Sequence, residues 1–369
     1  MIYAYKYLPH KIENFNSNIA HFFEQLFKND LAIYDENILL AAEFIPIVNK
    51  SPVSLKNNLS EITRIYHLLP DTDKQVLQNA FCIAKDIENL CTDTTINLVK
   101  FDEIHVDIRN LLKAFSVSLW EDFPQNQLVE NAYGQVQEHF QAFTSSVHQK
   151  ALICPFCGLH KLKPSGAPNR DAYDHYIPKA FYPFISINFK NLFPICHECN
   201  SDEKKTTDTL YDGINRERVF YPFDSHYQAN QLSVVIKPSV TYNPSNLKTL
   251  LNDIDWKYAI TLAGRTDSRL TSWDRIFHIQ RRYRENIVVY QIEWFEQLLE
   301  KYKRELVKGT SFENFKKEII DEAKSYISSW PLGILRYVYF NFLFSISDFE
   351  EKFFSFINKD EGAYFNQDR

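Results

Sequence analysis

The chain has 369 residues and a formal net charge of −6, which allows two or three domains of roughly 100–200 residues each. Hydrophobic residues make up 45% and charged residues 24%, and this ordinary globular balance excludes a disordered chain. The negative total excludes a global positive field, so any binding of nucleic acid has to depend on local basic patches. Glycine occurs only 8 times, which disfavours a turn-rich all-β fold and favours helices.

The N-terminal region carries the periodicity of amphipathic helices. Apolar residues recur at three- and four-residue intervals from Ile12 to about Ser145, as they do on the buried face of a helix. Pro52, Pro70 and Pro124 interrupt the pattern, because proline lacks a backbone donor and disfavours helix at the preceding residue. We predict roughly five to seven helices here, in a helical domain spanning 1–148 whose role the sequence does not reveal.

The composition changes at the centre of the chain. In the region 149–212, prolines interrupt short apolar runs and the polar residues become Cys, His, Asp and Asn, which indicates a separate module. In the region 213–369, three strands are predicted first, at Arg218–Phe223, Leu232–Lys237 and Tyr258–Leu262. Helical periodicity then returns from Trp273 to the end. The expected fold class is mainly α with a small α+β insert.

The opening residues of the chain and its most apolar later stretch predict no membrane association. The opening MIYAYKYLPHKIENF lacks the basic start and apolar core of a secretory signal. The stretch from Pro331 to Phe349 is interrupted by Arg336 and Asn341, so it is a poor membrane span. We expect a soluble, cytoplasmic protein.

Four of the six cysteines form two CxxC pairs, Cys154 with Cys157 and Cys196 with Cys199. Two such pairs can converge on one tetrahedral zinc ion, which four thiolates coordinate completely. With no position open for water or substrate, the predicted zinc is structural. Cys82 and Cys91 stand alone in helical sequence and are expected to be buried thiols.

The loop between the two pairs holds a second set of chemically distinctive residues. Asp174 and His175 are followed by Pro178, and Asn191 and Asn200 flank the second pair. Lysines 204 and 205 come shortly after. In this order the residues resemble the HNH (ββα-metal) endonuclease family, in the subgroup whose cysteine pairs bracket a DH…P…NL…CxxCN…K motif. The resemblance covers only the central module.

The resemblance implies a fold and a role for each motif residue. Two short strands and a helix would hold the site, and His175 would act as the general base that takes a proton from the attacking water. Asp174 and Asn200 would bind one catalytic divalent ion through hard oxygen ligands, which suits Mg²⁺ or Mn²⁺. Asn191 would hydrogen-bond across the loop and support the backbone near His175. The expected activity is hydrolysis of phosphodiester bonds in DNA, with RNA not excluded.

Basic residues offer candidate contacts to nucleic acid. Lys179, Lys204 and Lys205 follow the motif and could meet phosphates, although each is also a plausible solvated surface lysine. If Thr271 to Tyr302 is one helix, Arg275 and Arg282 lie seven residues apart on one face and form a basic stripe. The alternative is a salt-bridged helix surface without a ligand.

Three hypotheses for function follow. The first is the endonuclease, and the second is a zinc-binding module that docks nucleic acid or protein without catalysis. The third makes the helical flanks a scaffold for a partner such as an ATPase, with the nuclease as an effector in bacterial anti-phage defence. This third hypothesis rests on analogy alone. The sequence does not reveal DNA or RNA preference, sequence specificity, what restrains the nuclease, the partner or the oligomeric state.

Overall fold

The structure, a computed structural model, describes residues 1–51, 55–145, 152–227, 232–238 and 256–358. The chain forms two compact units. One comprises Met1–Tyr3, Ile153–Lys161 and Gln228–Arg369, and the other comprises Ala4–Leu152 and Leu162–Tyr227. These units do not follow the three sequence regions, because most of the central module packs with the N-terminal helices. Residues 149–151 of that module lie outside the described part.

The N-terminal helices are more numerous than the sequence predicts. Over the described residues up to Ser145 the α-helices number nine. They are α1 (Glu13–Asn29), α2 (Glu36–Leu39), α3 (Ile45–Lys50), α4 (Asn57–Leu68), α5 (Asp71–Ala84), α6 (Ile87–Thr92), α7 (Val106–Glu121), α8 (Gln127–Tyr133) and α9 (Val136–Ser145). The prediction of five to seven was wrong because several are too short to show a period. Local capping forms them instead, as where Asp35 and Asp86 accept hydrogen bonds from the first turns of α2 and α6.

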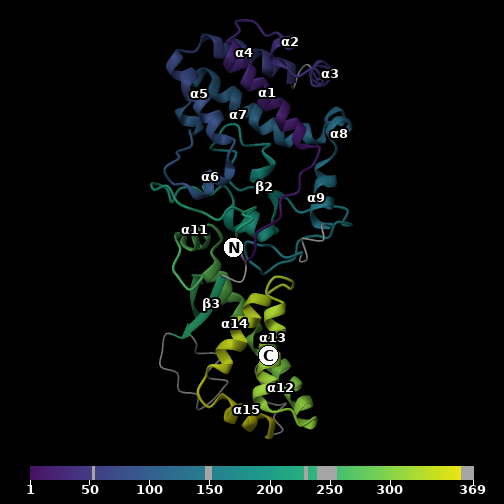
Figure 1. Cartoon of the computed structure of the whole chain (residues 1–369), viewed down its shortest axis with the longest axis vertical. Coiled ribbons are helices and arrows are strands. Elements are labelled where there is room, and N and C mark those ends of the chain that lie inside the picture. The colour runs from purple at the N-terminus through teal and green to yellow at the C-terminus, as the bar shows by residue number, and fades with distance from the viewer. Residues whose placement is uncertain (52–54, 146–151, 228–231, 239–255, 359–369) are drawn as a thin grey trace. The chain divides into compact units, whose positions relative to one another are not determined.

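An aromatic core joins the central module to the N-terminal helices, of which α1, α4, α5 and α7 lie together in Figure 1. Phe15, Phe22 and Phe23 of α1 are buried in it with residues of α4, α5 and α7. Ile187, from the loop of the central module, belongs to the same cluster, and Phe184 packs against it. The helical domain therefore supports the loop that follows the Asp-His pair. Of the two lone cysteines, Cys91 is buried as predicted, but Cys82 is exposed.

The central module contains two short strands and a short helical segment. Strand β1 (Tyr173–His175) pairs antiparallel with β2 (Leu192–Pro194), and His175 lies opposite Leu192. The short 3₁₀ helix η4 (Phe189–Asn191) leads into β2. The π-helical segment η5 (Glu198–Lys204) follows β2. Two further 3₁₀ turns, η2 (Phe101–Glu103) and η3 (Phe123–Gln125), border α7.

The other unit combines one hairpin with helices. Strands β3 (Leu232–Pro238) and β4 (Trp256–Leu262) are antiparallel. The helices are α11 (Ser268–Phe277), α12 (Ile279–Val307), α13 (Phe312–Ser325), α14 (Gly333–Phe344) and α15 (Phe349–Asn358). The second and third predicted strands are confirmed, whereas Arg218–Phe223 is not a strand. Among the described residues, the expected fold class of mainly α with a small α+β insert is confirmed.

The helix expected from Thr271 to Tyr302 is interrupted. His278 adopts a left-handed conformation with φ of 48°, so α11 ends there and α12 begins. Within α12 the helical periodicity expected from Trp273 onward is confirmed, since Ile287, Trp294 and Leu298 are buried. None of the described helices is both long enough and apolar enough to cross a membrane.

Candidate functional site

The two CxxC pairs form a candidate metal centre. The four sulfur atoms of Cys154, Cys157, Cys196 and Cys199 lie within 4.8 Å of one another, and all four residues are buried. A zinc–sulfur distance of about 2.3 Å places the thiolates of a tetrahedral site roughly 3.8 Å apart. None of the four forms a disulfide bond. The cluster is therefore close enough to bind one metal ion, and its four-thiolate donor set is that of a structural zinc site.

The first cysteine pair sits in a tightly bonded turn. The Cys154 amide donates to the His160 carbonyl, and the Gly158 amide donates to the Cys154 carbonyl. Gly158 has a φ of +70°, and an added Cβ would lie 3.1 Å from Ile2, so glycine is required here. The Tyr283 hydroxyl donates to the Cys157 carbonyl at 3.0 Å. These bonds fix the shape of the turn that presents the first cysteine pair.

His175 has a defined orientation. Its Nε2 lies 2.8 Å from the carbonyl oxygen of Ser186, and because a carbonyl only accepts, Nε2 carries the proton. The lone pair of a neutral ring is then on Nδ1. Burial lowers the pKa of His175 to about 3, with smaller contributions from Lys179 and Lys204. The ring is therefore neutral at physiological pH, the form that can accept a proton.

Trp120 forms one wall beside this histidine. Its ring, at the end of α7, meets the His175 ring edge to face with centroids 5.0 Å apart and planes at 88°. The centroid of the Trp120 ring also lies 6.3 Å from the centroid of the Tyr173 ring. Trp120 is separated from His175 by more than fifty residues in sequence, and no motif in the sequence marks it. Only the packing of α7 against β1 brings the two rings together.

Asp174 is paired with a buried lysine. The Lys204 ammonium lies 2.9 Å from Asp174 Oδ1, with side-chain exposures of only 1% and 4%. The same ammonium donates to the His175 carbonyl at 2.9 Å. Asp174 Oδ2 is buried and has no hydrogen-bond partner among the described residues. Burial raises the pKa of Asp174, and the charge of Lys204 opposes that rise.

The position of Lys204 corrects the expectation that it contacts phosphate. A lysine that is almost fully enclosed and bonded to two oxygens has no ammonium surface to offer a ligand. Lys205, the next residue, is exposed. Lys179 is partly buried and forms an ion pair with Glu121 at 2.7 Å. Of the three lysines, only Lys205 projects fully from the surface.

Asn191 hydrogen-bonds to the backbone of the loop after His175. Its side-chain oxygen accepts from the Ile177 amide at 2.8 Å, and its side-chain nitrogen donates to the Ile177 carbonyl at 2.9 Å. Its own carbonyl accepts from the Tyr176 amide. Asn191 is completely buried. Asn200 is partly exposed on η5, where its amide donates to the Cys196 carbonyl.

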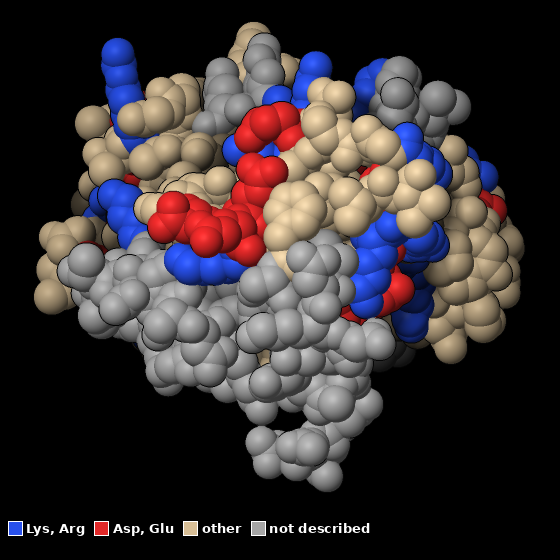
Figure 2. Space-filling model, turned by 90° about the horizontal axis from the view of Figure 1, so that it is seen from below, with Lys and Arg blue, Asp and Glu red and all other residues tan. Residues whose placement is uncertain are grey.

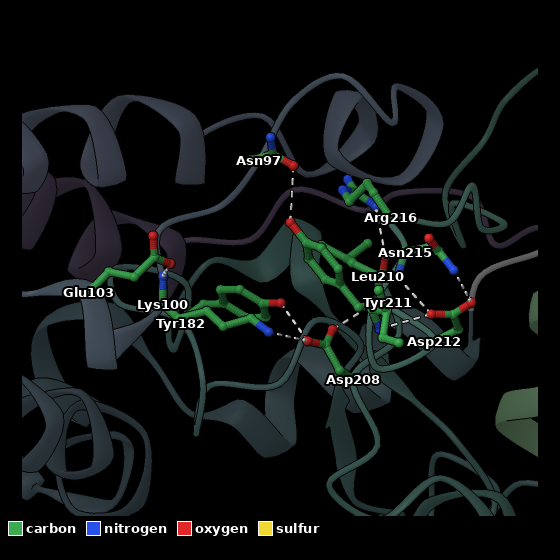
Figure 3. Close-up of polar contacts among 11 residues, drawn as sticks. Asn97, Lys100, Glu103, Tyr182, Asp208, Leu210, Tyr211, Asp212, Asn215 and Arg216 are labelled. Atoms are coloured by element: carbon green, nitrogen blue, oxygen red, sulfur yellow. Dashed lines mark hydrogen bonds and ion pairs between the residues drawn. The ribbon is translucent and has the colours of Figure 1, made fainter.

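A polar network fixes the segment that follows η5 (Figure 3). Asp208 accepts from the Tyr182 hydroxyl at 2.5 Å and lies 3.7 Å from the Lys100 ammonium. The Lys100 ammonium stands over the Tyr211 ring, and the Tyr211 hydroxyl donates to Asn97. These contacts attach the end of the module to the residues before α7, so they serve packing rather than chemistry.

Arg275 and Arg282 do not form the basic stripe that the sequence suggested. Arg282 is only 4% exposed and donates to the Phe277 carbonyl, and the break at His278 separates it from Arg275. Two other arginines form ion pairs, Arg269 with Asp267 and Arg281 with Glu285. Figure 2, the view from below, likewise shows basic and acidic side chains interspersed over its described part.

No protein-family model, no curated protein and no solved structure matches this chain.

Proposed function

We propose that this protein is a metal-dependent nuclease of the HNH class, with His175 as the general base. The observation that carries the proposal is the hydrogen bond from His175 Nε2 to the Ser186 carbonyl. It fixes the tautomer in which Nδ1 is the basic atom, and burial keeps the ring neutral. A base held in one orientation can take the proton of an attacking water with little reorganisation.

The donor set beside His175 fits a hard divalent cation. Asp174 Oδ2, buried and unpartnered among the described residues, is the oxygen that Mg²⁺ or Mn²⁺ would use, and Asn200 would add an amide oxygen. Such an ion would stabilise negative charge on the scissile phosphate and the departing oxygen. Lys204 fixes the Asp174 carboxylate through Oδ1, and Asn191 holds the loop that carries His175. The four cysteines would hold a structural zinc.

One observation favours a second candidate, a zinc-dependent docking module without catalysis. Lys204 already supplies a positive charge to Asp174, so the carboxylate is compensated without any divalent ion. In that case the Asp-His pair would serve folding alone. The two candidates differ in one measurable respect, which is cleavage that depends on added metal.

The test is a cleavage assay across substrates and metals. Purified protein is incubated with plasmid, linear duplex, single-stranded DNA and RNA, each with Mg²⁺, Mn²⁺, Zn²⁺ or EDTA. We expect cleavage with Mg²⁺ or Mn²⁺ that falls at least ~10²-fold in His175→Ala, with zinc content unchanged. His197→Ala is the matched control, because His197 is an exposed histidine of the same module.

Two outcomes would count against the nuclease. Binding of nucleic acid without cleavage under any metal would support the docking module. Equal cleavage by wild type and His175→Ala would remove His175 from the role of base.

A further inference from the structure

A pocket of about 290 Å³ adjoins His175 through Trp120. Its walls come from the end of α7, from η3, from α8 and from the start of α9, and the loop before β1 adds Arg170. All of these segments belong to the unit that holds His175. The pocket is thus made largely of helix ends, and it shares one aromatic wall with the proposed general base.

The lining has the chemistry of a site for a neutral heteroaromatic ring. It combines Trp120 with two carboxylates, Glu121 and Glu130, and with side-chain amides that include Gln137. Arg170 also lines the pocket and Lys179 pairs with Glu121, so the charges around it roughly balance, which suits an uncharged ring. The amides offer both donors and acceptors to the edge of such a ring. The volume is near the lower end of small-ligand pockets, about 300 Å³, which suits a single ring system rather than a larger molecule.

The ion pair at the pocket wall removes a charge that would repel a nucleic-acid strand. Lys179 pairs with Glu121 of the pocket wall at 2.7 Å, so one of the two acidic residues is neutralised. Lys179 follows His175 by four residues in the chain, so its ion pair connects the pocket wall to the segment after the proposed base. A strand with a phosphate at His175 would therefore meet no uncompensated negative charge at Glu121.

We propose that this pocket binds one unstacked nucleobase of the strand whose phosphate lies at His175. The inference rests on the proposed nuclease function and names its substrate class: a single strand, or a duplex opened at the cut site. A paired base would first have to leave its stack, at a cost that single strands do not carry. Acceptors on the walls favour bases with an amino group, which adenine, cytosine and guanine have and thymine lacks.

The test uses single-stranded oligonucleotides with one 2-aminopurine, whose fluorescence falls when the base stacks. The label is moved through the sequence, and binding is measured without added divalent metal. We expect quenching at one position in the wild type and little quenching in Trp120→Leu. Gln137→Leu, on another wall of the pocket, checks that the loss is not caused by disturbed packing around His175.

A cleavage assay is the second test of the pocket. An abasic nucleotide is moved along the same strand, and removal of the bound base should lower kcat/KM at the neighbouring phosphate roughly ten-fold. Trp120→Leu should abolish this difference between intact and abasic strands.

The outcomes separate the two proposals. Cleavage that is equal on intact and abasic strands, with no quenching at any position, overturns the pocket while the nuclease stands. Quenching at one position with no cleavage of any substrate overturns the nuclease and keeps a base-binding pocket. If neither quenching nor cleavage is observed, both the pocket proposal and the nuclease proposal are overturned.

Discussion

Lys204→Met removes the positive charge from the most enclosed ion pair of the candidate site. Methionine has nearly the length of lysine and fills the same space, so the change isolates the ammonium group. That group lies 2.9 Å from Asp174 Oδ1 and 2.9 Å from the His175 carbonyl. Without it, a buried carboxylate and a buried carbonyl both lose a partner.

The expected loss of stability follows from the burial of both partners. Their side chains are 1% and 4% exposed, so solvent does not screen the pair. Removing one member of such a pair leaves an uncompensated charge and costs about 3–5 kcal/mol. That is a large share of the roughly 5–15 kcal/mol that stabilises a folded protein. Adding Asp174→Asn to the variant removes the orphaned charge and should recover most of the loss.

Chemical denaturation followed by circular dichroism measures the effect, and Lys205→Met is the matched control. Lys205 is the exposed neighbour on the same segment, so its substitution should change stability by less than about 0.5 kcal/mol. The reasoning fails if Lys204→Met costs no more than this control. It also fails if the double variant is as unstable as Lys204→Met alone.

Three further predictions concern the metal centre, the loop and the response to pH. Cys154→Ser and Cys199→Ser should each lose the roughly one zinc ion per chain and much of the soluble yield, because metal binding and folding are coupled; metal analysis showing full zinc in both would refute the assignment. Asn191→Leu strips the Ile177 amide and carbonyl of their partners and should cost about 1–3 kcal/mol per group, so an unchanged melting temperature would contradict its support role. His139 is buried, which lowers its pKa to about 4, so between pH 6.5 and pH 4 the unfolded chain binds the proton and the folded chain does not. The His139 contribution to stability should therefore fall by about 3 kcal/mol as the pH drops through that window, and the loss measured over this window should be smaller by about that amount in His139→Phe.

Local residue patterns predicted those parts of the protein that neighbouring residues determine. The CxxC spacing predicted the cysteine cluster, because each pair already brings two thiolates together. The helical period from Trp273 onward predicted the helices there, because apolar residues at three- and four-residue intervals lie on one face of a helix. Each of these depends on residues that are close in sequence or on a motif with fixed order.

Residues brought together from distant segments could not be predicted in this way. Nothing in the sequence shows that Trp120 reaches His175, because that contact depends on how α7 packs against β1. The burial of Lys204 was missed for the same reason, since a lysine in a polar stretch looks solvated until its carboxylate partner is found thirty residues away. Arg282 was predicted at the surface. In the structure the left-handed residue His278 separates α11 from α12, and Arg282 lies on the buried face of α12.

The sequence alone therefore determined the kinds of chemical group in the candidate site and their order. The tertiary structure decided which of those groups are accessible, which are paired and which atom of His175 is basic. The physical reason is that residue type and spacing fix local geometry and donor chemistry, whereas burial, charge pairing and the tautomer of a histidine depend on partners from other segments. Ser186 illustrates the difference, because its carbonyl orients His175 only after the loop has folded against the N-terminal helices.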